Sequence, residues 1–163
     1  MKRKQKLILG ALALLLVGLT AWRLWPRSID SFMNFPSKDA NAVSCHLSLL
    51  ALPRMRSQSY DLKIETKEEA QAVLDILRRG RYQASLTNLL PWTWGRLDSG
   101  YGFDGRSIYL NAFVDGEDPK ICSMTFLGND KACVDWRRIN PMGNGMFDEL
   151  AAYIQANGTL RED

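Results

Sequence analysis

Residues 121–136, ICSMTFLGNDKACVDW, contain two apolar runs on either side of a turn sequence. The turn residues Gly-Asn-Asp-Lys at 128–131 are of the types that accept the backbone conformations of tight hairpins. Residues 121–127 and 132–136 are therefore predicted to be two strands of a hairpin. Strands joined by short hairpins run antiparallel, so this stretch decides the class of fold.

Further strands are predicted by alternation of apolar and polar residues. Val43, Cys45, Leu47 and Leu49 alternate with serine and histidine, which is the period of a strand with one buried face. The same alternation predicts a strand at 108–114, and we expect 59–64 to form another strand and 81–87 to add one more.

Two helices are predicted from a different period. Residues 67–79 place apolar side chains three and four positions apart, after a capping box formed by Thr66 and Glu69. Gly80 is expected to end this helix in the left-handed conformation. Residues 145–156 repeat the apolar stripe. The fold class is therefore α+β: an antiparallel sheet with two helices packed on one face, following an N-terminal transmembrane helix.

The predicted transmembrane helix is the run LILGALALLLVGLTAWRLW at 7–25. Its 19 residues would extend for about 28 Å as a helix, close to the ~30 Å hydrocarbon core of a bilayer. Lys2, Arg3, Lys4 and Lys6 precede it, which predicts a cytoplasmic N-terminus and an exported remainder. Leu19 occupies the −3 position of the nearest cleavage site, where a small residue is wanted, so the sequence favours an uncleaved anchor over a cleaved signal.

The sequence accordingly divides into a cytoplasmic basic tail at 1–6, the anchor at 7–25, a stalk at 26–42 and an extracytoplasmic α+β domain at 43–163. We expect a single-pass protein of the cell membrane with its C-terminal domain outside. Six of the 21 Lys and Arg lie in residues 1–27, so residues 28–163 carry 15 against 18 Asp and Glu, a net charge of −3. This charge argues against a nucleic-acid partner.

The sequence gives little support to catalysis or to a cofactor. His46 is the only histidine, and it alternates with the apolar residues of its strand, which places it on the solvent side. Cys45, Cys122 and Cys133 are favoured as free thiols, although a disulfide from Cys45 stays open. No C-x-x-C pair, phosphate loop or nucleophile motif is present, so we predict no catalytic residue, metal or cofactor.

One segment has the composition of a binding surface, at 89–106 (LLPWTWGRLDSGYGFDGR). Tryptophan, tyrosine and arginine dominate binding hot spots, and glycine-bearing loops commonly present such residues. The alternative is that its tryptophans close one end of the core. We predict a non-catalytic binding or accessory module with membrane lipid around its anchor and a protein or cell-wall partner. The alternatives are a structural subunit associating through the transmembrane helix and, less favoured, a secreted enzyme. The candidate contact residues are Trp92, Trp94, Arg96, Tyr101 and Phe103.

Overall fold

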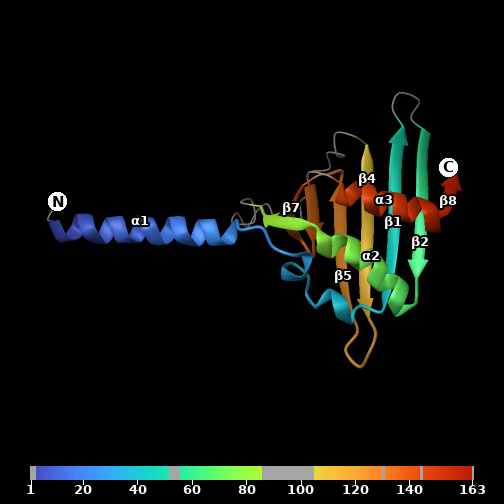
Figure 1. Cartoon of the computed structure of the whole chain (residues 1–163), viewed down its shortest axis with the longest axis horizontal. Coiled ribbons are helices and arrows are strands. Elements are labelled where there is room, and N and C mark those ends of the chain that lie inside the picture. Colours follow the sequence, from blue (N-terminus) through green and yellow to red (C-terminus); the bar gives the residue numbers. More distant parts are fainter. Residues whose placement is uncertain (1–2, 52–55, 86–104, 130, 144, 163) are drawn as a thin grey trace.

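The computed structural model describes residues 3–51, 56–85, 105–129, 131–143 and 145–162. Its elements follow the chain in an order of helix, strands, helix, strands and helix, with a final short strand (Figure 1). Their bounds are α1 Arg3–Arg23, η1 Ile29–Ser31, η2 Ser37–Asp39, β1 Ala42–Ala51, β2 Arg56–Ile64, α2 Lys67–Arg79, β3 Arg81–Ala84, β4 Arg106–Val114, β5 Lys120–Leu127, β6 Lys131–Val134, β7 Arg137–Met142, α3 Met146–Asn157 and β8 Thr159–Glu162.

The described strands form one eight-stranded sheet in the order β3-β7-β6-β5-β4-β1-β2-β8. Every neighbouring pair in this sheet is antiparallel. The long strands β1, β2, β4 and β5 lie together, and the short strands β3 and β8 form the two edges. The predicted α+β class with an antiparallel sheet is confirmed.

Helices α2 and α3 cover the same face of the sheet and contact each other (Figure 1). Leu74 and Leu77 of α2 and Leu150 and Ile154 of α3 are fully buried, as the apolar stripes predict. They share one core with the alternate residues of the central strands. The largest of these strand residues are Leu47, Ile108, Leu110, Met124 and Phe126.

Both ends of α2 are where the sequence predicts them, but the local chemistry differs. Thr66 makes no side-chain bond to the backbone, and its hydroxyl instead donates to a carboxylate oxygen of Glu69 at 2.9 Å. Gly80 is extended, with φ −67° and ψ 158°, so the predicted left-handed stop is wrong. Glycine is required there for space, because a Cβ would lie 2.7 Å from the hydroxyl of Tyr82.

The strand predicted at 132–136 is shorter than expected. It ends at Val134, and β7 begins at Arg137 after a connection of only two residues. The third strand of this meander, β7, and the edge strand β8 were not anticipated. Strand β8 pairs with β2 through Gln58 to Asp61, which is why the chain stays ordered beyond α3.

The segment at 26–42, predicted to be a stalk, contributes to the core. Ile29 and Ala40 are fully buried, and Phe32, Met33 and Phe35 are nearly so. The core of the domain therefore begins well before residue 43.

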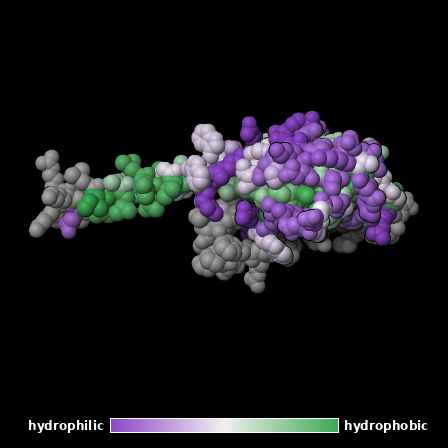
Figure 2. Space-filling model, turned by 90° about the horizontal axis from the view of Figure 1, so that it is seen from below, coloured by the Kyte–Doolittle hydropathy of each residue, from purple (hydrophilic) through white to green (hydrophobic). Residues whose placement is uncertain are grey.

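Helix α1 leads away from this domain, and its apolar surface is bare (Figures 1 and 2). Leu14, for example, is 76% exposed. Across the described residues, however, we find no helix with both the length and the apolar character that crossing a membrane demands. The anchor at 7–25 therefore stays a prediction.

The helical layer should respond strongly to truncation of its inward side chains. We expect Leu74→Ala and Leu150→Ala each to lower the free energy of unfolding by about 2–5 kcal/mol, because both side chains are fully buried. Ile121→Ala is the control, since this strand side chain is 54% exposed and should change stability by less than about 0.5 kcal/mol. Chemical denaturation measures the free energy of unfolding of all three variants. An equal loss in the three would contradict the burial of Leu74 and Leu150.

Candidate functional site

The segment that follows α1 is joined to the sheet edge by backbone pairing. Arg27 and Tyr82 exchange two backbone hydrogen bonds, of 2.8 and 2.9 Å, in an antiparallel bridge to β3. The side-chain amide of Gln83 donates to the carbonyl oxygen of Leu24 at 2.8 Å. These contacts cover the edge of β3 and hold the last turn of α1 against the domain.

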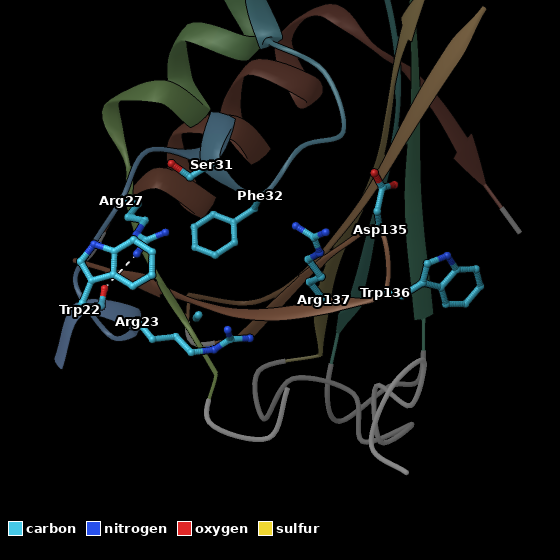
Figure 3. A pocket seen from close by; sticks show the side chains of 9 residues that line it. Trp22, Arg23, Arg27, Ser31, Phe32, Asp135, Trp136 and Arg137 are labelled. Carbon is cyan, nitrogen blue, oxygen red and sulfur yellow. Dashed lines mark hydrogen bonds between the residues drawn. The ribbon is translucent and has the colours of Figure 1, made fainter. Parts of the chain in front are cut away.

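A cavity of about 610 Å³ lies at this junction (Figure 3). We call it the junction pocket. Its walls come from the end of α1, from η1, from β3 and from the connection between β6 and β7. The lining residues are Trp22, Arg23, Arg27, Ser31, Phe32, Ala84, Asp135, Trp136 and Arg137.

Three arginines give the junction pocket its charge. The guanidinium of Arg27 lies 4.6 Å from the centre of the Trp22 ring and donates to the Trp22 carbonyl oxygen at 2.9 Å. Arg23, in the last turn of α1, and Arg137, at the start of β7, carry exposed side chains. In Figure 3 the Arg137 side chain reaches toward the Phe32 ring, whereas the Arg23 side chain lies apart from both.

The one acidic lining residue, Asp135, is engaged in holding the turn. One of its carboxylate oxygens accepts the backbone N–H of Ser123 at 2.9 Å, and the backbone N–H of Asp135 donates to the Ser123 carbonyl. Its other carboxylate oxygen is shielded from solvent. The solvent-accessible charge of the pocket is therefore mainly cationic.

The connection between β6 and β7 has an unusual backbone. Asp135 and Trp136 both have positive φ, 42° and 70°, which is the requirement of a type I′ turn. The second position of such a turn, here Trp136, favours glycine. A bulky residue with this backbone conformation is strained by about 1–2 kcal/mol. Trp136 is nevertheless 75% exposed, so burial does not compensate for this strain. The two hydrogen bonds between Asp135 and Ser123 hold the turn, and a positive φ at an exposed, bulky residue that lines the pocket makes Trp136 a candidate functional residue.

The three cysteines are free thiols in the structure, as favoured from the sequence. Burial raises the pKa of Cys45 to about 12. Burial, together with the negative charge of Asp135, raises the pKa of Cys122 to about 12 as well. Both thiols therefore stay protonated near neutral pH and are poor nucleophiles. Within the described parts of the chain, no three His, Cys, Asp or Glu side chains gather closely enough to hold a metal ion.

His46 lies on the open face of the sheet, as its alternation predicts. Its Nδ1 is 2.6 Å from a carboxylate oxygen of Asp61, and both side chains are about two-fifths exposed. Arg161 of β8 bonds the other oxygen of Asp61 at 3.2 Å. This arrangement is a solvated polar cluster on a sheet surface and lies outside the lining of the junction pocket.

The contact residues predicted from the sequence all lie in the segment 86–104, outside the described residues. Trp92, Trp94, Arg96, Tyr101 and Phe103 therefore stay predictions. The junction pocket was not predicted, because its lining comes from three separate parts of the sequence. Its only sequence signal was the pairing of tryptophan and arginine at 22–27, which was interpreted as an anchor boundary.

Comparison with known proteins adds no relative. No protein-family model matches the chain, and no curated protein or solved structure shows a significant match to it.

The strain at Trp136 predicts an unusual response to substitution. We expect Trp136→Gly to raise the free energy of unfolding by about 1 kcal/mol, because glycine accepts a φ of 70° without penalty. Trp136→Ala is the matched control. It also removes the exposed ring but keeps a Cβ, so its stability should stay within about 0.5 kcal/mol of the parent. Thermal and urea melts of both variants measure the difference. A glycine variant no more stable than the alanine variant would show that the turn is not strained.

Proposed function

We propose that this protein is a membrane-anchored binding module, with α1 in the lipid bilayer and the sheet domain outside the cytoplasm. The observation that carries the proposal is the bare apolar surface of α1. Burial of one large aliphatic side chain contributes about 1.5–3 kcal/mol, so an uncovered group of eight leaves on the order of 10 kcal/mol or more unrealised. The eight, each more than half exposed, are Ile8, Leu9, Leu12, Leu14, Leu15, Leu16, Val17 and Leu19.

The orientation of the anchor follows from the residues at its two ends. The lysines and arginine at 2–6 favour the cytoplasmic side. At the other end, Trp22 and Trp25 are exposed and suit the interface between lipid tails and water. The side chains of Arg23 and Arg27 can reach the headgroups from there. This arrangement would hold the sheet domain directly against the outer surface of the membrane.

A binding role fits the junction pocket better than a catalytic one. The described lining contains arginine, tryptophan, phenylalanine and a turn-forming aspartate, and it contains neither histidine nor cysteine. Such a surface suits recognition of an anionic group beside an apolar one. Residues 28–163 carry a net charge of −3, which makes nucleic acid a poor partner. A protein or a cell-wall polymer remains in our proposal as the partner of the domain, through 89–106.

The second candidate is a structural subunit that associates with another membrane protein through α1. The same bare apolar surface supports it. Gly10 and Gly18 have open space around them but lie eight residues apart, whereas close helix pairing favours small residues four apart. Replacing α1 by an unrelated spanning helix separates the two: a binding module keeps its function, and a subunit that associates through α1 loses it. A secreted enzyme is the least favoured reading.

Membrane attachment predicts the behaviour of the full chain in fractionation. We expect it to remain in the membrane pellet after an alkaline carbonate wash, with its domain cleaved by protease added outside the cell. Leu14→Arg combined with Leu16→Arg should release it, because each charge near the centre of a span costs about 2.5–3.5 kcal/mol.

The control for this experiment is Leu160→Arg, on the edge strand β8, which should leave the fractionation unchanged. Recovery of a shortened parent protein in the medium would show instead that 7–25 is a cleaved signal. Release of the intact parent by carbonate would contradict the anchor.

A further inference from the structure

The junction pocket presents two arginine side chains that have no partner among the described residues. Neither Arg23 nor Arg137 makes a hydrogen bond or ion pair with the described residues, whereas Arg27 is held on Trp22. Arg78, Arg79 and Arg161, in contrast, bond carboxylates elsewhere on the domain. Two arginines that line one pocket suit an anionic group with several oxygens, such as a phosphate, which arginine binds through paired N–H donors.

The pocket also has an aromatic rim. Trp22, 68% exposed, and Trp136, 75% exposed, lie on opposite sides of the lining, and the Phe32 ring lies beside the Arg137 side chain (Figure 3). The positive φ of Trp136, unusual for a bulky residue, is a second observation that favours a contact at this rim. Aromatic rings beside basic groups are characteristic of the zone where lipid headgroups meet acyl chains.

The position of the pocket indicates which kind of molecule carries the anionic group. One of its walls is the last turn of α1, with Trp22 and Arg23, so an anchor that ends there places the pocket at headgroup level. Its volume of about 610 Å³ lies within the 300–1,000 Å³ typical of small-molecule sites.

We propose that the junction pocket binds the phosphate of an anionic phospholipid headgroup beside the anchor, between Arg23 and Arg137. This inference rests on the proposed membrane attachment of α1. Bound lipid would fix the domain against the membrane surface, and the pocket would distinguish anionic lipid from zwitterionic lipid by net charge. The shared chemistry is a phosphate group, which a lipid headgroup or free inorganic phosphate could supply.

The test uses the full chain in detergent micelles, with lipid binding followed by native mass spectrometry. The probes are short-chain phosphatidylglycerol, short-chain phosphatidylcholine and inorganic phosphate. The test variant is Arg23→Gln with Arg137→Gln. Its charge-matched control is Lys38→Gln with Lys67→Gln, two exposed lysines that are not among the pocket-lining residues. Thermal melts of both variants confirm that each is folded.

We expect the parent and the lysine control to bind phosphatidylglycerol about 10- to 30-fold more tightly than the double arginine variant does. Phosphatidylcholine should bind all three proteins equally weakly, and inorganic phosphate should not compete. Equal affinity of the parent and the arginine variant for phosphatidylglycerol would show that the junction pocket is not the lipid-binding site. Competition by inorganic phosphate at equal concentration would show that the pocket binds free phosphate and not specifically the lipid headgroup.

Carbonate extraction of the same proteins keeps this inference separate from the proposed function. The double arginine variant should stay in the membrane pellet, because eight large apolar side chains of α1 are unchanged. If this variant loses phosphatidylglycerol binding but stays attached to the membrane, the result supports the junction pocket as the lipid-binding site. Extraction of the parent protein would overturn the anchor, and with it the headgroup as the source of the phosphate.

Discussion

Tyr82 connects the sheet edge, the helical layer and the chain leaving α1 at one fully buried position. Its hydroxyl donates to the carbonyl oxygen of Leu77 at 2.9 Å, in the last turn of α2. Its backbone exchanges two hydrogen bonds with Arg27 on one side and pairs with Pro141 of β7 on the other. Gly80 leaves the room that the ring occupies. Tyr82 is therefore the residue at which the end of α1, the sheet edge and the helical layer meet.

The junction pocket is a consequence of that connection. Pairing with β3 places the last turn of α1 near the turn between β6 and β7, so that Arg23 of α1 and Arg137 of β7 line one pocket. A flexible stalk at 26–42 would have left them apart. The burial of Ile29 and Phe32 instead makes this segment a wall of the domain. The proposed lipid contact thus depends on how the anchor joins the fold as much as on the residues it uses.

The sequence predicts the elements that local patterns determine. Helix α2 has its expected bounds because its apolar stripe acts within a few positions, although Thr66 and Gly80 end it by other contacts than those predicted. Strand β7 was missed because Asp135-Trp136 is not a recognised turn pair, and the turn forms despite the preference of that conformation for glycine. Strand β8 was missed because its pairing with β2 spans about a hundred residues. The pocket was missed for the same reason, since Arg23 and Arg137 meet only in the folded chain.

The central claim is that the junction pocket lies at the membrane surface while the opposite sheet edge faces water. Spin labels at Trp136→Cys and, separately, at Leu160→Cys on β8 test it, with the partly exposed Cys133 replaced by serine in both. In the full chain reconstituted into bilayers, power saturation reports how deeply each label lies. We expect the label at 136 to lie at the depth of the lipid headgroups and the label at 160 to lie in water. Equal aqueous exposure of the two labels would contradict it.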